Sequence, residues 1–332
     1  MPPPIRCWIL CLALLQACGP PLPPAPPGPA SCESPRVRAA RLALRAFEAV
    51  GQRRREIGPP IDPRRDPART GLIGLRRSPV TTVKGSLAAK QTTVNPNWAA
   101  VIVDLLQQAG VGRGDRVAAG LSGSFPALNI AALAALQTLG LEAVVVTSVG
   151  ASQYGANVEG LLWPDIERLL TSSGVLRLRS QAMSLGGRLD RATRLKPHGR
   201  GLLRRAIRRH GATLLQEPTY EASLTRRMAV FDRGGPVKAY VNVGGGTISV
   251  GSRLGKLAFA PGLNRSLPPE AAQVDSVMTR FARRDVAVIH LIRIKQLARA
   301  HSLPQQPRSM PGVQLEECGA SAAASPAPAR LD

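Results

Sequence analysis

Two short turns rich in serine and glycine hold the residue types best suited to chemistry. The first contains Ser122 and Ser124 between an apolar segment, 116–121, and a helical segment, 126–139. Unpaired N–H groups at the start of a helix attract carboxylate or phosphate, so this turn could form an anion cradle. The second turn, 148–152, follows the next apolar segment and presents hydroxyls in the same way. The pattern indicates anion binding beyond the ends of two strands.

The first turn has two other interpretations. Ser122 could be a nucleophile on a sharp strand-to-helix turn, but the G-x-S-x-G pattern of such turns has Ser124 at its last position here. A serine nucleophile also needs a base, usually histidine. His198 and His210 lie in basic sequence typical of a surface, and His290 interrupts an apolar run, as core histidines do. The turn could also be purely structural.

A polar segment, 78–97, precedes a predicted helix. Lys84 and Lys90 could neutralise an anion there, with the hydroxyls as further donors. A solvated loop with a helix cap is an equally good interpretation. Three glycines after Asn242 could form a backbone nest, although glycine turns usually solve only a backbone problem. The candidate ligand-binding residues are therefore Lys84, Lys90, Ser122, Ser124, Asn129, Ser148, Ser152, Asn242, Gly244, Gly245 and Gly246.

The chain is strongly basic, which favours polyanionic partners. Its 332 residues include 44 Lys+Arg against 21 Asp+Glu, for a formal net charge of +23. Segment 188–209 holds eight Arg and one Lys against one Asp. A solvated basic helix is the default interpretation of this segment, and docking of a polyanion is the alternative. Only 3% of residues are aromatic and they do not interleave with these arginines, so the sequence does not favour nucleic acid.

The cysteines limit the possible chemistry of the central chain. All five lie outside residues 33–317. That span therefore has no disulfide framework, no thiolate metal site and no cysteine nucleophile. It also has no dinucleotide fingerprint and no P-loop, so we expect neither a metal nor a cofactor.

Alternating apolar and helical segments predict an α/β fold with a mostly parallel sheet and helical crossovers, a Rossmann-like arrangement. In such sheets, ligands bind beyond the carboxyl ends of the strands. Segment 285–294 is either a last strand or a buried helix, and the stretch from the three glycines to Val250 is β-prone. The predicted strands are 116–121, 142–148 and 237–243, and the predicted helices are 36–57, 95–110 and 126–139.

The first residues predict export and attachment to a membrane. A short charged start and an apolar run end in Leu15-Gln16-Ala17-Cys18, which is similar to a bacterial lipobox with Cys18 as the lipidated residue. An ordinary signal sequence and an uncleaved anchor are the alternatives. For an uncleaved anchor, the arginines of 36–55 favour the cytoplasmic side. We expect a lipoprotein of the cell envelope whose domain lies outside the cytoplasm.

Composition divides the chain into successive parts. A Pro-rich tether follows the signal peptide, and a Pro/Ala/Ser-rich tail, predicted to be disordered, closes the chain. The predicted boundaries are 1–18 for the signal peptide with its lipobox, 19–35 for the tether, 36–57 for a helix, 58–70 for a loop, 71–303 for the α/β domain and 304–332 for the tail.

Several segments, in the same order, resemble the poly-gamma-glutamate system protein family. They include SGSFPALN at 122–129, SVGAS at 148–152 and NVGGG at 242–246. The resemblance covers about residues 71–303 and implies an accessory role beside a membrane-bound amide ligase and an export component of poly-γ-glutamate synthesis. The family brings no catalytic residues to carry over to this chain. The other matching segments are 78–82, 90–97, 155–157 and 163–165.

Our leading hypothesis is an accessory protein that binds poly-γ-glutamate, or a glutamyl or nucleotide intermediate, at the strand ends. A polyanion suits a basic chain held at a membrane. One alternative is a hydrolase or transferase that acts on the polymer with Ser122. Another is a scaffold that only holds the ligase and the exporter together. The expected partners are the polymer, the membrane, and the synthase and export subunits.

Overall fold

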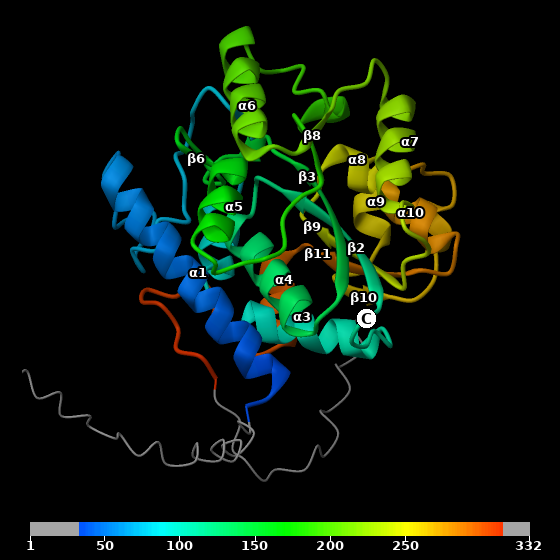
Figure 1. Ribbon diagram of the computed structural model, residues 1–332, viewed down its shortest axis with the longest axis horizontal. Helices are drawn as coiled ribbons and strands as arrows, with labels where there is room; N and C mark the ends of the chain where they lie inside the picture. Colours follow the sequence, from blue (N-terminus) through cyan, green and yellow to red (C-terminus); the bar gives the residue numbers. More distant parts are fainter. Residues whose placement is uncertain (1–32, 315–332) are drawn as a thin grey trace, which may run out of the picture. The chain divides into compact units, whose positions relative to one another are not determined.

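A seven-stranded sheet forms the centre of the computed structural model, which describes residues 33–314 (Figure 1). Its strand order is β10-β11-β9-β2-β3-β7-β8, and only β10, at one edge, runs antiparallel. The predicted α/β fold with a mostly parallel sheet is therefore confirmed. The predicted signal peptide, its Cys18 and residues 19–32 of the tether lie outside the described residues.

The described elements follow one another along the chain as follows. The strands are β1 (Thr81–Val83), β2 (Arg116–Ser122), β3 (Glu142–Ser148), β4 (Ala151–Ser152), β5 (Asn157–Val158), β6 (Leu161–Leu162), β7 (Ala182–Ser184), β8 (Thr213–Leu215), β9 (Ala239–Val243), β10 (Gly262–Asn264) and β11 (Ala287–Leu291). The α-helices are α1 (Pro35–Ile57), α2 (Leu87–Thr93), α3 (Trp98–Gln108), α4 (Pro126–Thr138), α5 (Trp163–Ser172), α6 (Pro197–His210), α7 (Tyr220–Phe231), α8 (Thr247–Val250), α9 (Arg253–Ala258), α10 (Val277–Ala282) and α11 (Ile294–Ala300). Two 3₁₀ turns are η1 (Arg188–Asp190) and η2 (Pro269–Ala271).

The register of the sheet brings the two serine turns to one edge. Strands β2 and β3 pair in parallel from Arg116 beside Glu142 to Ser122 beside Ser148. Both strands are nearly continuous buried runs, as expected for parallel strands covered on both faces. Because parallel strands end at the same edge, the turns that follow them lie side by side.

The structure decides the two predicted elements near the end of the domain, segment 285–294 and the stretch from Gly244 to Val250. The ambiguous segment 285–294 contains strand β11, which pairs in parallel with β9. The predicted β-prone stretch to Val250 is wrong, because its residues form the single helical turn α8. Gly251, with a φ of 72°, closes that turn by donating its N–H to the carbonyl of Thr247 at 2.7 Å. Glycine adopts this left-handed backbone without steric cost.

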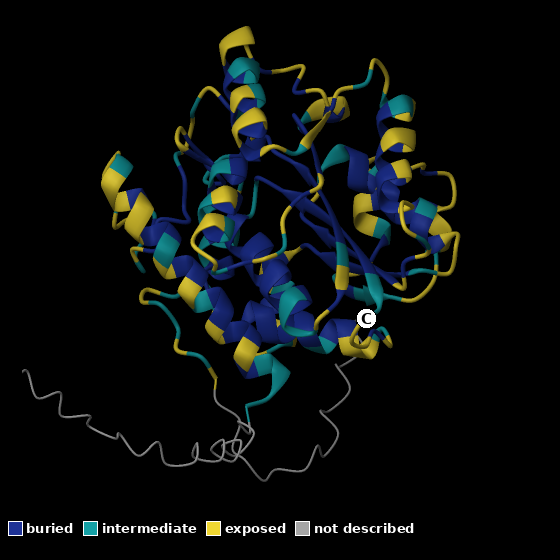
Figure 2. Cartoon of the chain, in the orientation of Figure 1, coloured by how far each residue is buried: buried dark blue, intermediate teal, exposed yellow. Residues whose placement is uncertain are grey.

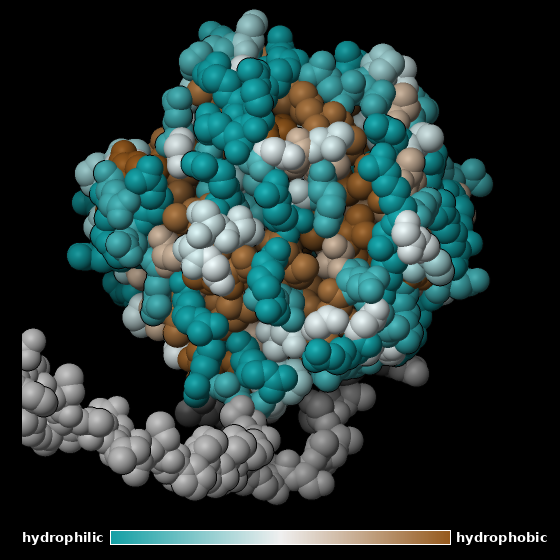
Figure 3. Space-filling model, viewed as in Figure 1, coloured by the Kyte–Doolittle hydropathy of each residue, from teal (hydrophilic) through white to brown (hydrophobic). Residues whose placement is uncertain are grey.

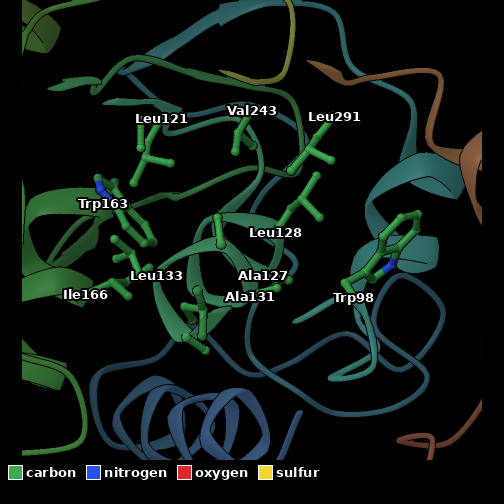
Figure 4. Close-up of a cluster of buried hydrophobic side chains, with 14 of the residues drawn as sticks. Trp98, Leu121, Ala127, Leu128, Ala131, Leu133, Trp163, Ile166, Val243 and Leu291 are labelled. Atoms are coloured by element: carbon green, nitrogen blue, oxygen red, sulfur yellow. The ribbon is translucent and has the colours of Figure 1, made fainter. Parts of the chain in front are cut away.

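Helices cover both faces of the sheet (Figures 1 and 2). Helices α1, α3, α4 and α5 form one apolar core with the sheet, and α7, α8 and α10 form the other. Helix α4 is buried almost all round because it lies between the sheet and α1. Figure 4 shows Leu128 of α4 beneath Leu121, Val243 and Leu291 of three neighbouring strands. Each such fully buried side chain stabilises the fold by about 2 kcal/mol.

Helix α1 belongs to the same compact unit as the sheet, which begins at Glu33. The Ser34 side chain caps the helix by accepting from the N–H of Val37 at 3.3 Å. The apolar side of the helix, including Phe47 at 1% exposure, packs on α3 and α4. The helix that follows the predicted tether is therefore part of the core.

The predicted disorder of the tail fails for residues 304–314. Asn97 donates its side-chain amide to the carbonyl of Gly312 at 2.8 Å and accepts from the N–H of Gln314 at 3.0 Å. These bonds tie the segment to the start of α3, which composition alone does not indicate. Residues 315–332 lie outside the described part of the chain. Within residues 33–314, no helix is both long and apolar enough to cross a bilayer.

Candidate anion-binding site

A cavity of about 630 Å³ opens beyond the carboxyl ends of the central strands. The chain runs from β2 through β3 and β7 to β8 on one side, then returns to β9 on the other side of β2. The strand order thus reverses between β2 and β9, and ligands of open α/β sheets bind at such a switch point. The cavity is lined there by Ser122 at the end of β2 and by Gly245 and Thr247 after β9.

Most of the predicted binding residues come together in this cavity. Segment 81–90, which supplies Lys84 and Lys90, reaches it because β1 pairs with β4, the last two residues of the second serine turn. The cavity is lined by eight of the candidates: Lys84, Lys90, Ser122, Ser124, Ser148, Ser152, Gly245 and Gly246.

Three other candidates lie beneath the cavity and shape it without lining it. Asn129 and Asn242 are fully buried, so the prediction that they contact a ligand is not supported. Asn129 donates to the carbonyl of Ser122 at 2.9 Å, which fixes the end of β2. Asn242 donates to the carbonyl of Gly244 at 2.7 Å. The third candidate, Gly244, has a φ of 84°, and a Cβ atom there would lie 3.2 Å from the ring of Phe125.

The first serine turn does not offer the predicted cradle of backbone N–H groups. The N–H of Gly123 donates to the carbonyl of Ser148 at 2.9 Å, and that of Ser124 donates to the Ser122 hydroxyl at 3.2 Å. The next N–H, of Phe125, donates to the Ser122 carbonyl at 3.1 Å. Since these donors are already paired inside the protein, the turn presents hydroxyls to a ligand.

A glycine is required where the two serine turns meet. A Cβ atom on Gly123 would lie 2.1 Å from the carbonyl oxygen of Val149. Its backbone also accepts the N–H of Ala156 at 2.8 Å, and Ser124 accepts the N–H of Ser152 through its hydroxyl at 3.0 Å. These contacts lock the two turns together and leave the Ser124 proton free to donate.

Positive charge dominates the lining of the cavity. Among the described residues, the lining includes six basic side chains and no carboxylate. None of the six forms an ion pair with a carboxylate of the described residues. The sequence pattern identified Lys84 and Lys90, and it placed Arg188 and Arg194 only in a basic segment typical of a surface. It did not identify Lys256 and Arg293, which follow β9 and β11, because the sequence around them contains no motif. The six are Lys84, Lys90, Arg188, Arg194, Lys256 and Arg293.

Lys90 is the unusual member of this set because it is buried. The residue is 3% exposed, and its Nζ lies 3.3 Å from the centroid of the Phe125 ring. Burial lowers the pKa of Lys90 to about 7, and no charged group in the described part of the chain offsets that effect. The cation–π contact with Phe125 gives only a fraction of the stabilisation that a carboxylate would provide.

The helix that carries Lys90 replaces the predicted solvated loop. Ser86 caps α2 by accepting from the N–H of Ala89 at 3.2 Å. Thr92 and Thr93 are buried and donate their hydroxyls to carbonyls of the same helix, at 2.8 and 2.7 Å. The hydroxyls of Thr92 and Thr93 are therefore hydrogen-bonded within the helix, and these two side chains do not face solvent.

A buried acid holds the wall of the cavity at the end of β3. Asp190 accepts from the hydroxyls of Ser148 at 2.9 Å, Ser184 at 2.6 Å and Ser223 at 2.9 Å. It also pairs with Arg227 at 3.0 Å, and both charged side chains are 1% exposed. The sequence predicted that the Ser148 hydroxyl would donate to a ligand. In the structure this hydroxyl donates its hydrogen bond to Asp190 instead. Its position in the wall is fixed by this network.

None of the four histidines lines the cavity. His290 is buried, as the sequence predicts for a core histidine. Its Nδ1 lies 2.9 Å from the side-chain nitrogen of Asn242, and burial lowers its pKa to about 3. The surface prediction for His210 is wrong, because its Nε2 lies 2.7 Å from the buried carboxylate of Glu167. Ser122 consequently has no histidine base in the cavity.

Comparison with protein-family models, curated proteins and solved structures gives no match to this chain. The site is therefore interpreted from its own geometry. Within the described residues, no cluster of three or more His, Cys, Asp or Glu side chains is arranged to hold a metal ion. A basic cavity lined by hydroxyls suits a ligand that carries carboxylate or phosphate groups.

Proposed function

We propose that this protein binds an anionic ligand in the cavity at the carboxyl ends of the strands, and that the ligand is poly-γ-glutamate or a glutamyl intermediate of its synthesis. In this proposal the chain is an accessory component of the biosynthesis or export of the polymer. The cavity supplies charge through six basic groups and hydrogen bonds through Ser122, Ser124 and Ser152. The sequence resemblance and the net charge of +23 agree with a polycarboxylate.

The observation that carries the proposal is the buried, unpaired amine of Lys90. Proteins rarely bury a lysine without a partner, because the charged form loses its hydration. No carboxylate of residues 33–314 pairs with Lys90, yet Lys90 lines the cavity. A ligand carboxylate placed there would provide the missing counter-charge.

A catalytic role for Ser122 has less support. The side chain accepts from the N–H of Ser124, and its hydroxyl makes no hydrogen bond to a histidine or to Lys90 among the described residues. Serine nucleophiles are activated by a base within hydrogen-bond reach. The hydrolase or transferase alternative therefore predicts cleavage of the polymer, which the binding proposal does not.

The location of the protein in the cell envelope is part of the same proposal. A lipid on Cys18 would hold the domain at a membrane beside the synthase and export subunits. Mass spectrometry of the mature N-terminus tests this directly. A diacylglyceryl-modified Cys18 as the first residue supports the lipoprotein, and an intact Met1 contradicts it.

Binding is tested by titrating the purified protein with poly-γ-glutamate at two salt concentrations. We expect saturable binding that weakens at higher salt, because several ion pairs form. Lys84→Gln and Lys256→Gln should each weaken binding, whereas Lys295→Gln, outside the cavity, should not. Following chain length in the same samples separates the two alternatives. Binding without shortening supports an accessory protein, and loss of length supports the hydrolase.

A further inference from the structure

A second basic cavity, of about 530 Å³, lies beyond the carboxyl ends of β7 and β8. It is lined by Leu185 directly after β7 and by Gln216, which directly follows β8. Three arginines supply its charge, with Glu217 as the one acid in the lining. The remaining lining residues are Arg191, Thr193, Arg200, Arg204 and Pro218.

The two cavities are neighbours along one edge of the sheet. Thr193 lines the second cavity and Arg194 lines the first, and consecutive Cα atoms are only about 3.8 Å apart. Residues 185–194 thus form a shared wall between them. In strand order the first cavity lies beyond β9, β2 and β3, and the second lies beyond β7 and β8.

We propose that the two cavities form one continuous binding track, and that a linear polycarboxylate lies across the 185–194 wall with successive carboxylates in each cavity. This inference rests on the proposed function, because the first cavity must bind the polymer for the track to continue from it. Strands are spaced about 4.8 Å apart, so the distance from β2 to β8 is about 14 Å. A single amino acid does not span that distance, whereas a chain does.

The three arginines of the second cavity form no ion pair with a carboxylate of residues 33–314. Arg204 donates to the Gln216 side chain at 3.0 Å, and Arg191 donates to the carbonyl of Pro218 at 2.6 Å. Arg200 donates to the carbonyl of Leu195. These neutral acceptors orient the three side chains and leave their charge available to an anion. The surface over α6 is correspondingly hydrophilic (Figure 3).

A polycarboxylate fits this track better than a nucleic acid does. Single-stranded nucleic acids bind through aromatic side chains on which bases stack. Of the described residues that line either cavity, only Phe125 is aromatic, and Lys90 already lies over its ring. The track therefore offers charge and hydrogen bonds without a stacking surface.

The experiment compares long poly-γ-glutamate with a γ-linked glutamyl trimer. The test protein is Arg200→Gln/Arg204→Gln, since glutamine keeps the helix and removes two charges. The control is Arg45→Gln/Arg55→Gln on α1, which removes the same charge from exposed positions outside both cavities. We expect the test variant to bind the polymer about tenfold more weakly and the trimer unchanged. The control should bind both ligands within about twofold of the wild type.

The outcomes separate the two proposals. Equal polymer affinity in the test and control variants overturns the track and leaves the first cavity as the whole site. Wild-type protein that binds neither the trimer nor the polymer overturns the proposed function itself. Inorganic polyphosphate serves as the competitor, and polyphosphate that binds tighter than the polymer overturns the assignment to a polycarboxylate. Thermal unfolding of each variant confirms that it is folded before it is titrated.

Discussion

Replacing Lys90 by Met should make the protein more stable at neutral pH. The unfolded lysine has its ordinary pKa of 10.5, whereas burial lowers the folded value to about 7. One unit of pKa corresponds to about 1.4 kcal/mol, so the buried amine costs about 4 kcal/mol of folding stability at pH 7. Methionine has a similar shape and no charge, so it removes this cost. The lost contact with Phe125 opposes the gain by about 1 kcal/mol.

The pH dependence follows from the direction of the shift. Between pH 7 and 10.5 the unfolded state binds a proton at Lys90 that the folded state does not. The stability of the wild type therefore rises with pH in this range as far as this group is concerned. The cost falls to about 2 kcal/mol at pH 9, so the advantage of Lys90→Met should shrink by about 2 kcal/mol between pH 7 and pH 9.

Urea unfolding of the wild type and the variant at both pH values measures this difference. Other titrating groups cancel in the comparison because both proteins contain them. Lys84→Met is the matched control, since Lys84 lies in the same cavity but is exposed, and it should change stability little at either pH. A Lys90→Met protein that is less stable than wild type at pH 7, or a difference that does not vary with pH, would refute the reasoning.

Two further changes test the walls of the cavity. Gly123→Ala should destabilise the protein by about 2–3 kcal/mol in urea unfolding, because the new Cβ meets a backbone carbonyl. Gly246→Ala is the control and should be nearly neutral, because the space around Gly246 is open. Equal losses of stability in the two variants would contradict the close approach of the turns. Asp190→Ala should cost about 3–5 kcal/mol because Arg227 stays buried without its carboxylate. Asp232→Ala breaks an exposed pair and should cost less than about 1 kcal/mol, and a loss as large as that of Asp190→Ala would argue against the buried network.

The sequence predicted the centre of the fold well because that part is governed by local pattern. Continuous apolar runs followed by serine and glycine identify β2 and β3 as buried parallel strands. Their turns then had to lie at one edge of the sheet, which is how Ser122 and Ser148 could be placed in one site. Segment 285–294 was undecided, because a short apolar run is compatible with a strand or a buried helix until its pairing with β9 is known.

The positions of the basic side chains in the cavity were harder to predict, because packing between segments distant in sequence determines them. Lys90 lies over the ring of Phe125, which is distant in sequence, and no periodicity in segment 78–97 indicates that contact. Arg188 enters the cavity from a wall in which Leu189 and Asp190 both adopt a left-handed backbone, φ 55° and 58°, which is uncommon for residues other than glycine. His210 lies beside Glu167 of helix α5, and the basic sequence around His210 gives no indication of this contact.

Proton uptake on ligand binding tests the central claim most directly. At pH 8 most of the free Lys90 is neutral, because its pKa is about 7. A carboxylate bound beside it should raise that pKa, so titration calorimetry of the γ-linked trimer in two buffers of different ionisation enthalpy should show uptake approaching one proton per site. Lys90→Met should bind more weakly and take up none. Binding without proton uptake, together with full affinity in Lys90→Met, would contradict a role for Lys90 as the ligand's counter-charge.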